Sequence, residues 1–160
     1  MAPAPDDDPT LAALIAELEA HEAELVLPRF TNDDAWALGS WLWTTATARG
    51  LAVTIDVQRG DQRLFHAARP GTAADNDGWI ERKVQVVRRF GSSSYLVGRR
   101  MQRDGDTVEG LGLDPARYAA HGGCFPVLVA GVGMVGTVTV SGLAQADDHA
   151  LVVEALRALH

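Results

Sequence analysis

The sequence has very little cysteine and no long apolar run. Cys124 is the only cysteine among 160 residues, which excludes an intrachain disulfide and a multi-cysteine zinc site. No apolar stretch approaches the roughly 20 residues that a membrane-spanning helix needs. The first ten residues, MAPAPDDDPT, lack the basic flank and the apolar stretch of a secretory signal. We therefore expect a cytoplasmic protein that has no membrane partner.

Positive charge is also scarce. Asp and Glu number 21 against 14 Lys and Arg, so the formal net charge is −7 at pH 7. Nucleic-acid binding requires a basic surface, and an anionic membrane attracts one, so this balance argues against both partners. Thirteen of the 14 basic residues are arginine, and Lys83 is the only lysine. With the many Ala and Gly residues, that bias is typical of a GC-rich genome, and we treat it as background.

The chain is long enough for one domain with one core. Its hydrophobic content of 47% and charged content of 22% are ordinary for a globular protein. We predict a disordered lead over 1–9 and a single domain over 10–160. Apolar residues recur at helical spacing over 10–24, which predicts a first helix. The segment 25–30 is predicted to be an extended link, because Pro28 cannot sit in a central strand.

The next patterns predict a helix and a hairpin. A helix is expected over 31–50, where Thr31 and Asp34 stand at capping-box spacing and a glycine follows the last helical residue. Residues alternate between apolar and polar over 51–58 and return over 63–67 after a short turn. This alternation predicts a β-hairpin.

The remaining elements are predicted from cap residues and β-rich runs. Three helices each begin at a polar residue: one at Asp75 or Asn76, ending near Gly91; one at Ser92 or Ser93; and one at Asp114, with Pro115 in its first turn. Two valine-rich runs over 125–130 and 134–142, joined by glycines, predict a second hairpin. A last helix carries Val152, Val153 and Leu156. This order indicates an α+β fold with an antiparallel sheet.

Two long motifs carry a resemblance to a known superfamily. The run HGGCFPVLVAGVGMVGTVTVSGLAQADDHALVVEAL, residues 121–156, resembles the signature of the GlcG/HbpS-like proteins. These are also called heme-degrading domains and include the C-terminal domain of PduO. The run HAARPGTAADNDGWIERKVQVVRRFGSSSYLVG, residues 66–98, resembles the branch that carries PGT-x-x-DND-x-WI-x-RK followed by F-G-x-S-S. The resemblance covers nearly all of the chain after residue 10.

The resemblance implies a profilin-like fold, with three α/β/α layers around a five-stranded antiparallel sheet and helices on both faces. It also implies a homo-oligomer. Some members of the superfamily bind heme or act beside cobalamin metabolism, so heme is the cofactor that the resemblance suggests. It assigns no axial ligand, because no ligand position of the family can be matched to a residue of this chain.

Six residues make up the predicted binding site: His66, Arg82, Lys83, His121, Gly122 and Gly123. Arg82 and Lys83 are suited to clamping a carboxylate or propionate, although a solvated face or a subunit salt bridge is the structural alternative. His66 ends a strand before a Gly-rich loop, so it either lines a pocket or is a structural histidine. His121 belongs to the motif and either serves as acid, base or ligand or holds its loop by hydrogen bonds.

The stretch around His121 raises two further questions. Gly122 and Gly123 allow a positive φ or a close backbone approach, in a turn or in a cradle of N–H groups for an anion. Neither flank has a phosphate-loop pattern, which favours the turn. Cys124 is predicted to be a small buried hydrophobe rather than a nucleophile, because a lone cysteine near a histidine is a weak signature.

The sequence predicts structural roles for several other residues whose side chains could take part in catalysis or binding. Ser141 ends a strand without a G-x-S-x-G elbow, so it is predicted to serve in a turn. Asp148 and His149 are neighbours that point roughly 100° apart on a helix, and they are predicted to be first-turn residues complementing the helix dipole. The tryptophans Trp36, Trp41, Trp43 and Trp79 are predicted to lie in the core or between subunits. No complete catalytic set and no metal site are visible.

These observations support two functional hypotheses. The first is a pocket near His66, Arg82, Lys83 and His121 that binds a small anionic or tetrapyrrole-like ligand, with a histidine as the acid or base in any catalysis. The second is a non-enzymatic assembly or adaptor protein, in which the same residues fix loops and interfaces.

Overall fold

The computed structural model describes residues 9–159, which form five helices and five strands. In chain order these elements are α1 (Pro9–Glu24), β1 (Val26–Leu27), α2 (Asn32–Arg49), β2 (Thr54–Arg59), β3 (Gln62–Ala68), α3 (Ala74–Phe90), α4 (Ser94–Asp104), β4 (Cys124–Val129), β5 (Gly133–Ser141) and α5 (Gln145–Leu159). The predicted lead over 1–9 lies outside the described residues, apart from Pro9, which begins α1. Within residues 9–159, none of the helices has the length and apolar character needed to cross a bilayer.

The five strands form one sheet in the order β1-β4-β5-β2-β3. The two predicted hairpins, β2–β3 and β4–β5, are antiparallel, and β2 also pairs antiparallel with β5. The prediction of a purely antiparallel sheet is wrong in one place, because β1 runs parallel to β4 and makes the sheet mixed. This edge strand has only two residues, within the segment predicted to be an extended link. Pro28 follows it directly, so the rule that keeps proline out of central strands holds.

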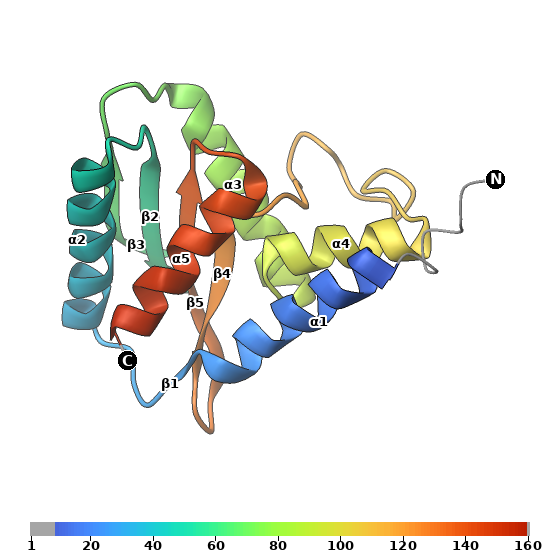
Figure 1. The fold of residues 1–160 in the computed structure, drawn as a ribbon, viewed down its shortest axis with the longest axis horizontal. Helices are drawn as coiled ribbons and strands as arrows, with labels where there is room; N and C mark the ends of the chain where they lie inside the picture. Colours follow the sequence, from blue (N-terminus) through green and yellow to red (C-terminus); the bar gives the residue numbers. More distant parts are fainter. Residues whose placement is uncertain (1–8, 160) are drawn as a thin grey trace.

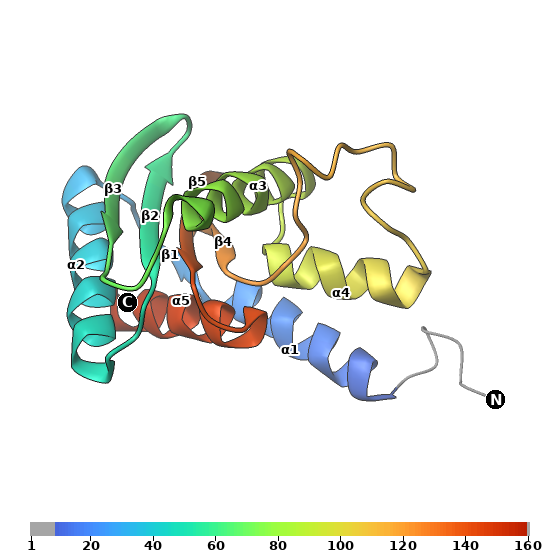
Figure 2. The same ribbon diagram turned by 90° about the horizontal axis from the view of Figure 1, so that it is seen from above.

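The helices cover both faces of the sheet, as the sequence predicted. Figure 2 shows α3 on one face and α2 with α5 on the other. The helices α1 and α4 pack against each other beyond the β1–β4 edge, as Figure 1 shows. The three-layer α/β/α arrangement is therefore confirmed, with an additional helix pair at one edge.

The two faces of the sheet differ in chemistry. Ile55 and Val57 of β2, and Val53 directly before it, are fully buried and belong to the main core, which α2 and α5 complete. Alternate residues of a strand point to opposite faces, so Thr54 and Asp56, which are also fully buried, face α3. The layer beneath α3 is thus built partly from polar side chains. Asp56 of this layer accepts hydrogen bonds from Gln58 and Arg63, whereas the buried hydroxyl groups of Thr54, Thr137 and Thr139 have no hydrogen-bond partner among the described residues.

The predicted caps are confirmed in two helices and corrected in two other places. Thr31 and Asp34 form the capping box of α2, and Ser93 caps α4 through its side chain. In α3 the residue at the cap position is Ala73, and Asn76 accepts a hydrogen bond from the Ala73 N–H. The helix predicted at Asp114 does not form. The side chain of Asp114 instead accepts a hydrogen bond from the N–H of Ala116, which closes a turn.

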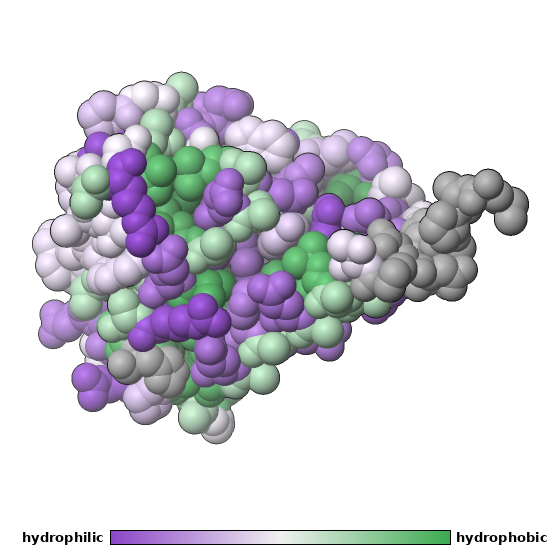
Figure 3. Space-filling view, in the orientation of Figure 1, coloured by the Kyte–Doolittle hydropathy of each residue, from purple (hydrophilic) through white to green (hydrophobic). Residues whose placement is uncertain are grey.

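Figure 3 shows the face that carries α1, α2 and α5, where polar side chains surround apolar hollows. One hollow lies between α2 and α5 and is lined by Leu51, Leu143 and Leu151 among others.

Of the predicted core or interface tryptophans, Trp41 packs against the main core, while Trp36 is 66% exposed. Trp43 is 36% exposed, and the guanidinium of Arg69 lies 5.4 Å from its ring centre.

Candidate functional site

The strongest candidate site is a cavity of about 280 Å³ between α3, the end of β5 and the start of α5. Three of its residues, Asp75, Trp79 and Lys83, follow one another at intervals of four along α3 and therefore share one face of the helix. Asn76 of the same helix also lines the cavity and donates a hydrogen bond from its amide to the Ser141 hydroxyl at the end of β5 (3.3 Å).

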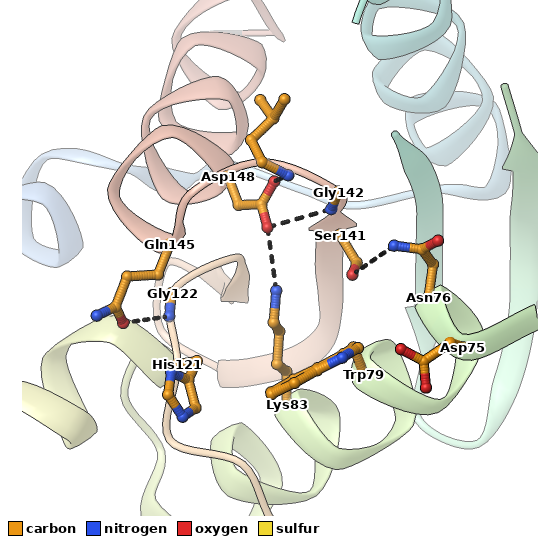
Figure 4. Close-up of a pocket in the computed structure, with 11 residues that line it drawn as sticks. Asp75, Asn76, Trp79, Lys83, His121, Gly122, Ser141, Gly142, Gln145 and Asp148 are labelled. Carbon is orange, nitrogen blue, oxygen red and sulfur yellow. Dashed lines mark hydrogen bonds and ion pairs between the residues drawn. The ribbon is translucent and has the colours of Figure 1, made fainter. Parts of the chain in front are cut away.

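The opposite wall comes from the segment before β4 and from α5. Figure 4 shows His121 and Gly122 on one side of Lys83 and Asp75 on the other, with Asp148 of α5 above. Gln145, the first residue of α5, accepts a hydrogen bond from the Gly122 N–H (3.1 Å). Both motifs that carried the family resemblance, DND-x-WI-x-RK and HGG, thus meet in this cavity.

A buried ion pair forms one wall of the cavity. The Lys83 ammonium lies 3.2 Å from a carboxylate oxygen of Asp148 and donates a second hydrogen bond to the Val140 carbonyl oxygen (3.2 Å). The two side chains are only 4% and 3% exposed. Asp148 also accepts hydrogen bonds from the N–H groups of Gly142 and Leu143. Burial raises the pKa of Asp148, and the Lys83 charge and these hydrogen bonds oppose that rise.

Gly123 makes room for this ion pair. Its φ is +136°, which L side chains rarely adopt. A Cβ on Gly123 would lie 2.4 Å from the Val140 carbonyl oxygen and 2.7 Å from the Lys83 ammonium nitrogen. The second glycine of the motif therefore serves a close approach of the backbone to Lys83.

His121 stands at the exposed edge of the cavity. Its ring meets the indole of Trp79 edge to face, with the ring centres 5.4 Å apart. Partial burial lowers the pKa of His121 below 6.5, and the positive charges of Lys83, Arg99 and Arg82 lower it further. The imidazole is therefore neutral at pH 7. Among the described residues, neither ring nitrogen of His121 has a hydrogen-bond partner.

Two arginines near His121 have no carboxylate partner within residues 9–159. The guanidinium of Arg82 lies 4.1 Å from the ring centre of Trp79 and donates to the Gly78 carbonyl oxygen (3.3 Å). The guanidinium of Arg99 lies 5.6 Å from the Tyr95 ring centre, and its buried Nε has no hydrogen-bond partner. Most other arginines of the chain form ion pairs, such as Arg49 with Glu154.

His66 lies apart from the other predicted site residues. Its two ring nitrogens lie 2.9 Å from carboxylate oxygens of Asp56 and Asp77. The fully buried Asp56 also accepts hydrogen bonds from Arg63 and Gln58. The structure thus brings Lys83, His121 and Gly122 together as lining residues, with Gly123 packed against Lys83. Arg82 contacts Trp79 but lines a separate hollow with Glu81 and Arg117, and His66 ties β3 to the start of α3.

Two structural predictions near the site have different outcomes. Cys124 is fully buried, as predicted, and burial raises its pKa to about 12, so its thiol is not reactive at neutral pH. Asp148 lies in the first turn of α5 as predicted, but complementing the helix dipole does not describe its role or that of His149, because both side chains are buried and have specific neighbours. Asp148 turns into the cavity, and His149 packs on the other side against His21, Tyr95 and Phe125.

Sequence reasoning missed several residues of the cavity. Asp75 and Asn76 were interpreted as caps, Ser141 as a turn residue and Asp148 as a response to the helix dipole. The intervals of four between Asp75, Trp79 and Lys83 were the available signal for a shared helix face. Nothing in the sequence pointed to Gln145. Within the described part of the chain, no group of three or more His, Cys, Asp or Glu side chains is placed to hold a metal ion.

Comparisons with known proteins agree with this architecture. The family model described as "Haem degrading protein HbpS-like" matches residues 30–157. UPF0303 protein SCO2848 of Streptomyces coelicolor is 62% identical over 146 residues, which cover 91% of this chain and 92% of that protein.

Solved structures give the same result. The Ybr137w protein superposes with a TM-score of 0.82 at 33% identity, covering 90% of this chain and 86% of that one. A structure entitled the PduOC:Heme Complex superposes with a TM-score of 0.69 at 14% identity, covering 81% of this chain and 94% of that one, and shows a likeness of fold alone. On the family match and the close relative, this chain belongs to the HbpS-like haem degrading protein family.

Proposed function

We propose that the protein binds a small organic anion, with a carboxylate as the recognised group, in the cavity between Lys83 and His121. The observation that carries this proposal is the charge around His121. The three charged groups that shift its pKa, Lys83, Arg99 and Arg82, are all positive. Asp148 pairs with Lys83, and neither Arg82 nor Arg99 lines the cavity, but these two guanidinium groups have no carboxylate partner within residues 9–159 and their charges favour an anion beside His121.

The groups within the cavity supply hydrogen bonds for such a ligand. The Lys83 ammonium has three N–H donors, and Val140 and Asp148 accept from two of them. The third donor is available to a ligand. The neutral imidazole of His121 offers one donor and one acceptor, and the hydroxyl of Ser141 adds a further polar contact. The face of Trp79 provides an apolar surface beside them.

The size of the cavity limits the ligand. Ligand sites that enclose a drug-sized molecule have volumes of about 300–1,000 Å³, and this cavity measures about 280 Å³. A short carboxylic acid fits that space. A tetrapyrrole ring is too large to be enclosed in it.

The test is a calorimetric titration of the protein with propionate and with inorganic phosphate at constant ionic strength. We expect saturable binding of propionate that His121→Gln weakens at least about tenfold, because it removes a direct contact. Arg82→Gln should weaken binding less, because it removes a nearby positive charge from outside the cavity lining. Arg89→Gln is the matched control, because Arg89 is an exposed arginine of the same helix. Equal affinity in the wild type and all three variants, or no saturable binding, would contradict the proposal.

Heme is a second candidate ligand, favoured by one observation. His121 is a neutral imidazole without a hydrogen-bond partner among the described residues, which is the form that ligates heme iron. The cavity does not enclose the macrocycle, so heme would have to lie at its mouth. A hemin titration tests this: a stoichiometric Soret shift that is lost in His121→Ala supports heme binding, and a shift that neither saturates nor responds to the mutation excludes it.

The assembly hypothesis rests on Trp36, which is 66% exposed on α2. Tryptophan is enriched in protein interfaces, and a homo-oligomer stays a prediction from the family resemblance. Light scattering of the Trp36→Ser variant tests it. An oligomer that dissociates supports an interface at α2, and an oligomer of unchanged mass argues against it.

A further inference from the structure

We propose that the amine of Lys83 forms a reversible Schiff base with a small 2-oxo acid bound in the cavity. This proposal rests on the anion site described above and adds a covalent step to it. The substrate class is a carboxylate with an adjacent ketone or aldehyde.

The first observation is the placement of the chain's only lysine. The other 13 basic residues are arginines, which are always protonated and do not form Schiff bases. Among the described lysine and arginine residues, Lys83 alone is buried, with a side chain that is 4% exposed, and it lines the cavity. In Figure 4 its nitrogen lies between the Gly122 segment and Ser141, with Asp148 above.

The second observation is the proton acceptor beside Lys83. An amine attacks a carbonyl only when it is neutral. The Asp148 carboxylate oxygen lies 3.2 Å from the Lys83 nitrogen and can take its proton. Burial raises the pKa of Asp148, which favours this transfer. The neutral imidazole of His121 is a second proton carrier in the same cavity.

The anion site explains how the carbonyl would be positioned. The carboxylate of the ligand would lie toward His121, which lines the cavity and is exposed to the positive charges of Arg82 and Arg99, although neither arginine lines the cavity itself. The adjacent carbonyl carbon then faces Lys83, which is held against the Val140 carbonyl oxygen. The missing Cβ of Gly123 removes an atom that would otherwise lie 2.7 Å from the Lys83 nitrogen.

The chemical step is balanced without any oxidant or reductant. The Lys83 proton passes to Asp148, and the nitrogen lone pair forms a bond to the carbonyl carbon. The nitrogen, now positively charged, gives one proton to the carbonyl oxygen, with the neutral His121 imidazole as a carrier, and a carbinolamine results. Asp148 returns the proton that it took from Lys83 to the hydroxyl group, which leaves as water while the nitrogen lone pair forms the double bond to carbon. The products are one protonated imine, one water molecule and the Asp148 carboxylate.

The experiment is reductive trapping of the wild-type protein with pyruvate and sodium cyanoborohydride, followed by peptide mapping. We expect one stable adduct per chain on the peptide that contains Lys83, formed at least about tenfold faster than on the N-terminal amine, because the site binds and orients the ligand. Propionate, which has the carboxylate but no ketone, should compete with the reaction. The Lys83→Arg variant should give no internal adduct, and His121→Gln should slow its formation.

Trapping only at the N-terminus would overturn the proposal, and so would labelling of Lys83 that propionate does not reduce. Peptide mapping on the wild type makes this result independent of whether the Lys83→Arg variant folds. The propionate titration separates the two proposals. Saturable propionate binding without a Lys83 adduct contradicts the Schiff base alone, and absence of both contradicts the anion site as well.

Discussion

Two neighbouring residues of α5, Asp148 and His149, are buried on different sides of the helix. Asp148 is buried beside a countercharge, and His149 is buried among aromatic rings. Asp148 faces the cavity, where Lys83 supplies a countercharge at 3.2 Å and two backbone N–H groups donate to the carboxylate. His149 faces a second hollow between α1 and α5. There its ring stacks on His21 with the centres 5.3 Å apart, and their nitrogens lie 3.1 Å from each other.

The two regions differ in how they offset the free-energy cost of burying an ionisable side chain. Burial lowers the pKa of His149 to about 3, so this imidazole is neutral at pH 7, and its buried Nδ1 has no hydrogen-bond partner. The His149 region thus also borders a hollow, but it avoids the cost of a buried charge by keeping the imidazole neutral. The Lys83–Asp148 region keeps polar and charged groups beside an open cavity, which is costly unless they have a function. The comparison supports the assignment of ligand binding to the cavity.

The largest expected effect is a loss of stability when the positive charge beside Asp148 is removed. The change Lys83→Met leaves the Asp148 carboxylate buried without a cation, which typically costs about 3–5 kcal/mol of unfolding free energy. Urea denaturation at pH 7 measures this loss. It should shrink as the pH falls, because protonated Asp148 needs no countercharge. The control Arg89→Met, on an exposed part of α3, should change the stability by less than about 0.5 kcal/mol. Similar losses in both variants would contradict the role of Lys83 as the countercharge of Asp148.

The second effect belongs to His149. Its folded pKa of about 3 lies below 6.5, so the unfolded state binds the proton more tightly and stability falls as the pH drops below 6.5. Between pH 7 and pH 5 this group removes about 2 kcal/mol. The change His149→Phe should reduce the loss over that interval by this amount, as measured by urea denaturation at each pH. The same pH dependence in wild type and variant would show that His149 is not held neutral.

The third effect tests the close approach at Gly123. Alanine at this position should cost about 2–3 kcal/mol, because it adds a clash with Val140 and Lys83 to an unfavourable φ. Gly133→Ala is the matched control, since its φ is +101° but no atom lies within 4 Å of the added Cβ. We expect a loss of about 1 kcal/mol there. Thermal unfolding of both variants checks the prediction, and equal losses would mean that φ alone explains the glycine.

The smallest effect concerns Asp75, the exposed acid at the edge of the cavity. The negative charge of Asp75 repels an anionic ligand, and the surrounding solvent weakens this repulsion. Asp75→Asn should therefore tighten propionate binding by about two- to threefold at low salt. Asp33→Asn changes a comparable first-turn acid of α2 and should leave the affinity unchanged. Titration at two ionic strengths measures both. A weaker affinity in Asp75→Asn would indicate that this carboxylate contacts the ligand instead.

The sequence was sufficient to predict most of the fold, because its signals are local. Helix α2 was delimited by the Thr31–Asp34 box and by Gly50, and both hairpins followed from alternation and glycine-rich turns. The wrong predictions concern segments whose structure depends on contacts with residues far away in the sequence. The strand β1 exists only because Val26 and Leu27 find the edge of β4, and Pro115 marks a turn rather than a helix.

The candidate site could be predicted only in part for the same reason. Lys83, His121 and Gly122 stood out by residue type and motif, and they meet in the cavity. His66 was grouped with them because it also precedes a Gly-rich loop, yet its partners are Asp56 and Asp77. Whether an acid such as Asp148 is exposed or buried depends on which element lies above it, and no local pattern contains that information.

The most direct test of the central claim compares the two sides of α5 in one experiment. Propionate is added to ¹⁵N-labelled protein, and the amide and indole resonances are followed by NMR. We expect saturable chemical-shift changes for the amide resonances of Gly122 and Gly142 and for the indole resonance of Trp79. The amide resonances of His21 and His149 should change little. Shifts centred on the His21–His149 side, or none that saturate, would contradict it.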